Sequence, residues 1–183
     1  MRFTTLVLAV TLAAGLVISA AAPTYPQGPM GGHITTQCDV YAYVIDRDPK
    51  GMNVRSGPGS TFKIIGNLPN QDVNGISVHI TGSKGDWMRV DIAVEEGGDE
   101  DRTFFKGEGW LYGPLLGIDG VGSGTKLYRQ ASSKSGTIGN LPGGNDGATV
   151  RGCQGKWMYV ESQNLKGWAA PDTLCTNPLT TCP

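Results

Sequence analysis

The pentapeptide Ile65-Gly66-Asn67-Leu68-Pro69 occurs a second time in this chain, as Ile138-Gly139-Asn140-Leu141-Pro142. The segments after the two copies are also alike. In each, a β-like run and a short turn come first. The next landmark is Trp87-Met88-Arg89-Val90 in the first copy and Trp157-Met158-Tyr159-Val160 in the second. A Gly-Trp pair then follows, at 109–110 and at 167–168. Because these landmarks recur in the same order, the sequence indicates a duplicated module.

The composition predicts a protein made almost entirely of β-strands. Glycine accounts for 28 of the 183 residues, about twice the average share of about 7%. Glycines scattered among valines, tryptophans and tyrosines favour short strands joined by tight turns. After the N-terminal segment there is no long apolar stripe with the period of a helix. The net charge of −1 argues against a nucleic-acid partner, because binding phosphates requires a basic surface.

The N-terminus has the pattern of a signal peptide. Arg2 precedes an apolar run from Leu6 to Ile18, and small residues follow at positions 19–22. This pattern predicts a signal peptide over residues 1–21, because a charged start, an apolar run and a small-residue cleavage zone occur in that order. The run is too short to span a bilayer comfortably. We therefore expect a secreted or periplasmic protein without a membrane span after cleavage. Residues 22–37 are rich in proline and glycine and should form a flexible leader.

The four cysteines predict two disulfide bonds. Cys38, Cys153, Cys175 and Cys182 are an even number in an exported chain, where thiols become oxidised. Three connectivities are possible. The short separation within the second unit favours Cys153–Cys175, with Cys38–Cys182 joining the two ends. A metal site is the alternative, but the chain has no Cys-x-x-Cys spacing and the second unit has no histidine.

An acidic insert distinguishes the first unit from the second. Trp87 and Trp110 are 23 positions apart, whereas Trp157 and Trp168 are 11 apart. The additional residues form an expected surface loop at 94–106. Its acidic side chains suggest a calcium site as an alternative to a solvated loop, although the spacing is not that of an EF-hand. The candidate ligands are Glu95, Glu96, Asp99, Glu100 and Asp101, of which Glu95, Glu96, Asp99 and Asp101 are preferred. The expected cofactor and metal content is nevertheless none.

The first unit contains four short motifs in a fixed order. They are residues 52–59 (Met-Asn-Val-Arg-Ser-Gly-Pro-Gly), the first pentapeptide, residues 85–90 (Gly-Asp-Trp-Met-Arg-Val) and Gly109-Trp110. With these motifs the unit resembles a bacterial SH3 (SH3b) domain. The second unit is a degenerate copy. It keeps residues 155–160 (Gly-Lys-Trp-Met-Tyr-Val) and Gly167-Trp168 but has Tyr-Arg-Gln-Ala-Ser at 128–132 instead of the Arg-Ser-Gly-Pro loop.

The resemblance implies two tandem small SH3-like barrels joined by a short Gly-rich linker. The expected boundaries are 38–117 for the first domain, 118–124 for the linker, 125–175 for the second domain and 176–183 for a tail. It also implies which side chains face the interior of each barrel. These are Val54, Ile65, Leu68, Val78, Ile80, Val90 and Trp110, and then Leu127, Ile138, Leu141, Val150, Val160 and Trp168.

The inventory of catalytic side chains is small, so we expect no enzymatic activity and no catalytic residues. His33 lies in the leader, and the alternation of residues 78–80 predicts that His79 faces solvent. A Cys38–His79 pair would suit a small cell-wall hydrolase. Paired cysteines in an exported chain argue against it. SH3b domains often accompany cell-wall hydrolases, but no residues are left to form a catalytic domain.

The aromatic side chains are the candidate ligand-binding residues. Trp and Tyr offer a large contact area with a polar group, which suits recognition of peptides or glycans. The alternative is that they complete a small core, which we favour for Trp110 and Trp168. The expected binding residues are Phe62, Trp87, Tyr112, Tyr128 and Trp157, around a groove between residues 56–62 and 82–87. The aromatic signature of proline-rich-peptide binders is absent, so a polyproline ligand is not expected.

The leading functional hypothesis is an exported, non-enzymatic binding protein. By the resemblance, its target would be cell-wall peptide or another component of the cell envelope. The alternative is a structural or interaction protein that binds one exported protein partner and has no affinity for the wall.

Overall fold

A computed structural model describes residues 35–70, 75–97, 102–121, 124–142, 147–177 and 179 of the chain. The prediction of an all-β protein is confirmed, since these residues form strands and a single 3-10 turn, η1 (Gly113–Leu115). The strands are β1 (Thr36–Val44), β2 (Met52–Arg55), β3 (Ile64–Leu68), β4 (Ile76–Lys84), β5 (Trp87–Glu95), β6 (Thr103–Tyr112), β7 (Leu116–Gly120), β8 (Thr125–Tyr128), β9 (Thr137–Leu141), β10 (Ala148–Gln154), β11 (Trp157–Ser162), β12 (Leu165–Ala169) and β13 (Leu174–Cys175).

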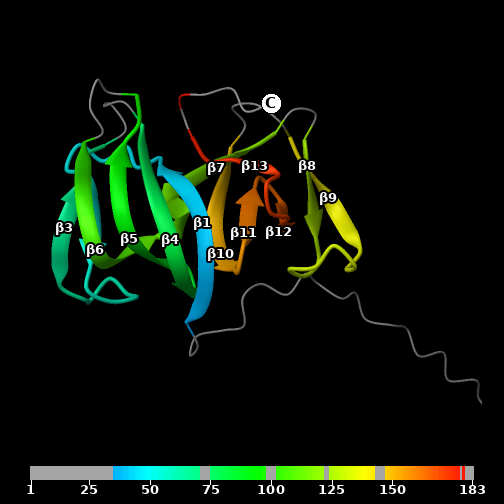
Figure 1. The fold of residues 1–183 in the computed structure, drawn as a ribbon, viewed down its shortest axis with the longest axis horizontal. Coiled ribbons are helices and arrows are strands. Elements are labelled where there is room, and N and C mark those ends of the chain that lie inside the picture. Colours follow the sequence, from blue (N-terminus) through cyan, green and yellow to red (C-terminus); the bar gives the residue numbers. More distant parts are fainter. Residues whose placement is uncertain are drawn as a thin grey trace, which may run out of the picture.

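The strands form one continuous, open sheet instead of two separate barrels. Their order is β3-β2-β6-β5-β4-β1-β7-β10-β11-β12-β8-β9, and β13 pairs with β7 outside this path. Outward from the β1–β7 pair the order is the same in both directions, with β1 to β6 matched by β7 to β12. Figure 1 shows β3 to β6 on one side of the molecule, β8, β9, β11 and β12 on the other, and β1, β7 and β10 between them. We call the β1–β6 side the first half and the β7–β12 side the second half.

The two copies of the pentapeptide occupy the same place in the two halves. In the first half, Met52 pairs with Leu68 and Val54 pairs with Gly66. In the second, Thr125 pairs with Leu141 and Leu127 pairs with Gly139. The register shifts at the following residue in both ladders, between Val54 and Arg55 and between Leu127 and Tyr128. The repeat in the sequence is therefore a repeat in strand register, down to the position of the bulge.

The core includes nearly all of the residues expected to face inward, but Ile65 was assigned to the wrong face. Ile65 is 43% exposed, whereas Leu68 is fully buried. Because side chains alternate along a strand, the burial of Leu68 turns Gly66 inward and Ile65 outward. A Cβ at Gly66 would lie 3.1 Å from the Phe105 ring, so Phe105 fills the space that a larger residue at 66 would take. Ile138 in the second copy is only partly buried against the core.

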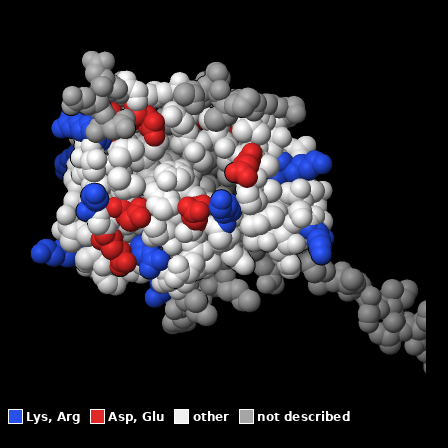
Figure 2. Space-filling model, in the orientation of Figure 1, with Lys and Arg blue, Asp and Glu red and all other residues white. Residues whose placement is uncertain are grey.

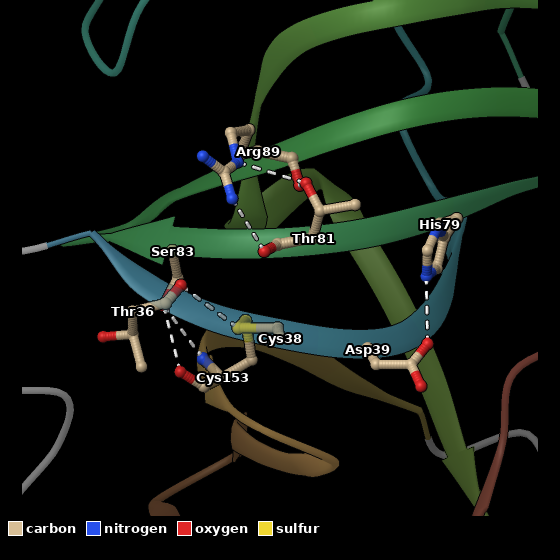
Figure 3. Close-up of a disulfide and its surroundings, with 8 residues drawn as sticks. All are labelled: Thr36, Cys38, Asp39, His79, Thr81, Ser83, Arg89 and Cys153. Carbon is tan, nitrogen blue, oxygen red and sulfur yellow. Dashed lines mark hydrogen bonds and ion pairs between the residues drawn. A yellow bond between two sulfur atoms is a disulfide. The ribbon is translucent and has the colours of Figure 1, made fainter.

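A disulfide joins β1 to the second half, and it corrects the expected connectivity. Cys38 is bonded to Cys153, with 5.8 Å between their Cα atoms (Figure 3). The expected pairings of Cys153 with Cys175 and of Cys38 with Cys182 are therefore both wrong. The start of β1 runs beside the β10–β11 turn, where Asp39 N–H donates to the carbonyl of Gly155 (2.9 Å). Cys175 is also disulfide-bonded, and Cys182 lies outside the described residues.

A buried serine adds a second contact between the halves beside the disulfide. Ser83 on β4 is 1% exposed. Its hydroxyl donates to the carbonyl of Cys153 (3.2 Å) and accepts from the Cys153 N–H (3.1 Å). Both backbone groups of Cys153 are therefore satisfied by one side chain from the other half, which buried polar groups require.

Several expected boundaries differ from the structure. Thr36 and Gln37 belong to β1, so the expected leader ends earlier than residue 37. Residues 118–120 lie in β7, a central strand, where a linker was expected. Part of the expected surface loop at 94–106 is strand, because β5 runs to Glu95 and β6 begins at Thr103. The expected signal peptide over residues 1–21 lies outside the described residues. In the part of the chain that is described, no helix has the length and apolar character needed to cross a bilayer.

Removing the Cys38–Cys153 bond should lower stability substantially. The bond joins residues separated by 115 positions, and closing such a long loop restricts the unfolded chain. We expect the double substitution Cys38→Ala and Cys153→Ala to lower the free energy of unfolding by about 2–5 kcal/mol, measured by urea denaturation. Non-reducing peptide mapping of the wild type is the control. A peptide joining Cys153 to Cys175 would contradict the observed connectivity.

The Tyr43 hydroxyl joins β1 to β7 and is sensitive to alkaline pH. It donates to Asp119 Oδ2 at 2.8 Å. Burial, and then the hydrogen bond and charge of Asp119, raise the pKa of Tyr43 well above its ordinary value of 10.0. The fold thus favours the neutral phenol. The stability that the neutral Tyr43 phenol gives to the folded state is complete below the ordinary pKa of tyrosine. It is lost as the pH rises towards the pKa of Tyr43 in the folded state.

Tyr43→Phe should therefore weaken the alkaline loss of stability. We expect the free energy of unfolding of the wild type to fall more steeply above a pH of about 10 than that of Tyr43→Phe. Urea denaturation across this range measures the difference. Asp119→Asn keeps an acceptor but loses the charge, and should give an intermediate slope. Parallel slopes for all three proteins would refute the coupling.

Candidate functional site

A hollow of the first half lies where the β1–β2 connection, the loop after β2 and the β4–β5 hairpin meet. Its volume is about 630 Å³, within the usual range for ligand pockets. We call it the first-half groove. Its lining residues are Asp46, Asp48, Gly51, Met52, Asn53, Arg55, Gly59, Ser60, Trp87, Tyr112 and Leu115.

Two carboxylates on one wall of the groove are fixed by backbone hydrogen bonds. Asp46 is 9% exposed, and its Oδ1 accepts from the Asp48 N–H at 3.0 Å. Asp48 Oδ1 in turn accepts from the Lys50 N–H at 2.9 Å. These are turns in which an aspartate side chain closes the loop. They hold negative charge beside the groove in a defined position.

Gly51 allows this turn to return close to β3. Its φ is +73°, and a Cβ there would lie 2.1 Å from the carbonyl oxygen of Leu68. Both the conformation and the close approach exclude any other residue without rearrangement. The glycine therefore fixes the path of the carboxylate-bearing turn against the pentapeptide strand.

Trp87 and Tyr112 supply the aromatic surface of the groove. They face each other across the β5–β6 ladder, in which their Cα atoms are paired. The ring centroids are 5.4 Å apart with 50° between the ring planes, an arrangement in the favourable range for aromatic pairs. Tyr112 is 39% exposed. The structure thus places two of the five expected binding residues in one groove.

Phe62 lies beside this groove instead of within it. A Cβ on Gly57 would lie 2.2 Å from the Phe62 ring, so the ring covers the backbone of the loop. Arg55 Nη1 donates to the carbonyl of Phe62 at 2.8 Å, which connects the loop to β2. Phe62 remains 45% exposed. Its contacts support a role in shaping the loop that carries Gly59 and Ser60.

The second half keeps its tryptophan but changes the partner. Trp157 contacts Tyr128 with 5.5 Å between centroids, edge to face. Tyr128 occupies the ladder position that Arg55 has in the first half, since each pairs with a tryptophan of the closing strand. Ala170 follows β12 where Tyr112 ends β6. Neither Tyr128 nor Trp157 lines the first-half groove, so the two halves present different surfaces.

His79 makes more contacts than its expected solvent-facing position indicated. Its Nδ1 lies 2.9 Å from Asp91 Oδ1 and its Nε2 lies 3.1 Å from Asp39 Oδ1. Its ring stacks on Tyr41, with centroids 4.7 Å apart. A protonated ring could donate to both carboxylates, whereas a neutral ring has one N–H. The sulfur of Cys38 is bonded to Cys153, so this chain has no Cys38 thiolate for His79 to activate.

The candidate calcium ligands are only partly within the described residues. Asp99, Glu100 and Asp101 lie outside them. Glu96 Oε2 accepts from Asn177 Nδ2 at 3.1 Å. Across the described ranges, no group of three or more His, Cys, Asp or Glu side chains is arranged to hold a metal ion. The face drawn in Figure 2 carries acidic and basic side chains interspersed, without a field of one sign.

Sequence reasoning missed Asp46, Asp48, Asn53 and Arg55 as groove residues. A signal existed for the last two. In β2 the residues Met52 and Val54 are buried, and Asn53 and Arg55 alternate with them on the outer face. The spacing Asp46-x-Asp48 before a glycine is also a turn signal. Neither pattern reveals that both segments border the same groove as Trp87, because that contact is remote in sequence.

Comparison with known proteins gives a partial match. The family model for the bacterial SH3 domain matches residues 50–116, and no curated protein matches the chain. Among solved structures, NlpC2 from Trichomonas vaginalis is 18% identical over 75% of this chain with a TM-score of 0.29. NlpC1 from the same organism is 16% identical over 82% with a TM-score of 0.30. This chain covers 48% and 51% of those chains. Residues 50–116, which include most of the first-half groove, are thus similar to a bacterial SH3 domain.

Proposed function

We propose that this is an exported, non-enzymatic binding protein whose first-half groove takes peptide of the bacterial cell wall. The single observation that carries the proposal is the composition of this groove. It combines an aromatic pair and Arg55, which lie in the segment similar to a bacterial SH3 domain, with two fixed carboxylates from the turn just before that segment. Such a lining suits a peptide that carries both ammonium and carboxylate groups, because each charge has an oppositely charged partner.

The second half enters the proposal as a further SH3-like unit with a weaker surface. Its strand order and its pentapeptide register match those of the first half. The pair of Tyr128 and Trp157 offers aromatic contact, but Tyr128 stands in the place of Arg55. We therefore assign principal affinity to the first half and auxiliary contact to the second.

The absence of catalysis is also part of the proposal. Support comes from Cys38 and His79, the side chains that a small wall hydrolase would have used. Cys38 is in a disulfide, and both ring nitrogens of His79 face aspartates. The disulfide also agrees with an oxidising compartment outside the cytoplasm.

A second candidate function is the binding of an exported protein partner. It is favoured by three exposed apolar side chains at the β3 edge. Phe62, Ile64 and Ile65 are 45%, 48% and 43% exposed. At the corresponding positions of the second half stand Ser135, Thr137 and Ile138, so two of the three apolar side chains are replaced by polar ones. Exposed apolar patches are one mark of protein–protein contacts.

Co-sedimentation of residues 22–183 with purified insoluble peptidoglycan tests the proposal. We expect the wild type to be found in the pellet. Trp87→Ala combined with Tyr112→Ala should weaken binding about tenfold or more, because aromatic anchors in a groove contribute most of the affinity. The bound fraction across a concentration series gives the change, and circular dichroism verifies that the variant is folded.

Trp157→Ala is the matched control, since it removes the corresponding tryptophan of the second half. Its binding should stay within about twofold of the wild type if the auxiliary surface contributes little. EDTA should not change sedimentation. A wild type that stays in the supernatant would exclude wall binding and leave the protein-partner function. Equal binding by wild type and double variant would instead place the wall site elsewhere.

A further inference from the structure

A second hollow lies at the junction between the two halves, separate from the first-half groove. Its volume is about 290 Å³, just under the range usual for drug-sized ligands. We call it the junction pocket. One wall comes from β1 and the other from β11 and the segment around β13. Its lining residues are Asp39, Val40, Tyr41, Lys156, Met158, Ala170, Pro171, Asp172, Leu174 and Thr176.

The β1 wall carries a fixed carboxylate and an aromatic ring. Tyr41 is 50% exposed, and one face of its ring is covered by the stacked ring of His79. His79 Nε2 also lies 3.1 Å from Asp39 Oδ1, and Figure 3 marks this contact with a dashed line. His79 is anchored in turn by Asp91 on β5 (2.9 Å). One histidine therefore positions both wall residues before any ligand is present.

The opposite wall carries charges of both signs. Lys156 follows Gly155 in the β10–β11 turn, and Asp172 lies in the turn before β13 with a φ of 61°. Within the described ranges, neither side chain makes an ion pair or hydrogen bond. Elsewhere on this half, Arg151 and Lys166 both pair with Glu161. The unpaired charges of the junction pocket are thus available to a ligand.

Part of the pocket lining is apolar. Met158 is 2% exposed, and Leu174 packs against the core cluster. Ala170 and Pro171 also line the pocket. A small ligand would therefore meet an apolar surface and charges of both signs within one hollow, an arrangement that fixes orientation.

We propose that the junction pocket binds a small zwitterion of amino-acid size. The carboxylates of Asp39 and Asp172 take its ammonium group, and the Tyr41 ring adds a cation–π contact. The ammonium of Lys156 takes its carboxylate. An aliphatic side chain of the ligand packs on Met158 and Leu174. The site does not depend on wall recognition by the first-half groove, because the two hollows share no lining residue.

Titration of the full mature protein with L-leucine, followed by NMR chemical shifts, tests this site. We expect saturable shifts at pocket residues with a dissociation constant on the order of millimolar, as suits few exposed contacts. N-acetyl-leucine lacks the ammonium and leucine amide lacks the carboxylate, so both should bind at least about threefold more weakly. The derivatives also distinguish a free amino acid from the end of a peptide. N-acetyl-leucine mimics the C-terminal residue of a peptide, and leucine amide mimics the N-terminal residue, so each carries only one of the two charges.

Asp172→Asn is the most informative variant, because asparagine also tolerates a positive φ. It should weaken leucine binding about two- to fivefold, and Lys156→Gln should do the same. Trp87→Ala, in the other hollow, is the matched control and should bind leucine as the wild type does. The absence of shifts at saturating leucine, or equal binding of leucine and its blocked derivatives, would overturn the proposal. Unchanged binding by both charge variants would overturn it as well.

Discussion

Backbone hydrogen bonding between β1 and β7 determines how the rest of this molecule is arranged. The two strands pair antiparallel, Tyr43 with Gly117 and Val44 with Leu116. Each is the first strand of its half, and β4 and β10 pair on their outer sides. Because these ladders are continuous, neither half ends in an edge at the junction. A single core cluster accordingly includes buried residues from both halves.

Side chains reinforce this pairing at both ends of β1. At its start, Cys38 is bonded to Cys153, and Ser83 satisfies the backbone of the same cysteine. At its other end, the Tyr43 phenol donates to Asp119 on β7. A Cβ at Gly117 would lie 2.7 Å from the Tyr43 ring, so the glycine makes room for that ring. The junction combines covalent, polar and packing contacts within one strand.

Much of the fold could be predicted because its signals are local. The pentapeptide predicted a repeat, and the resemblance to a bacterial SH3 domain, which rests on local motifs, placed Val54 inside. Ile65 was misplaced because the inward position beside it holds a glycine, whose space Phe105 fills from another strand. The disulfide was misassigned for a related reason. Sequence proximity favoured Cys153–Cys175, but β1 lies beside the β10–β11 turn through pairing that no local pattern encodes.

Two residues that line the first-half groove had been selected from the sequence, and the others had not. Trp87 and Tyr112 could be selected from the sequence because large aromatic side chains are candidate binding residues wherever they occur. Asp46 and Arg55 are ordinary charged residues in the sequence. They become candidates only once the groove that they share with Trp87 is seen.

The continuous sheet also affects how the two proposed binding surfaces would act together. A flexible linker would let each surface find its ligand separately, with a gain set by effective concentration. Here β7 includes residues 118–120, three of the seven residues expected to form a linker. Because β7 pairs with β1 and β10, the spacing between the surfaces is set by strands. A target that engages both surfaces must present its groups at that spacing. Selectivity would then depend on the spacing of the target's groups as well as on their chemistry.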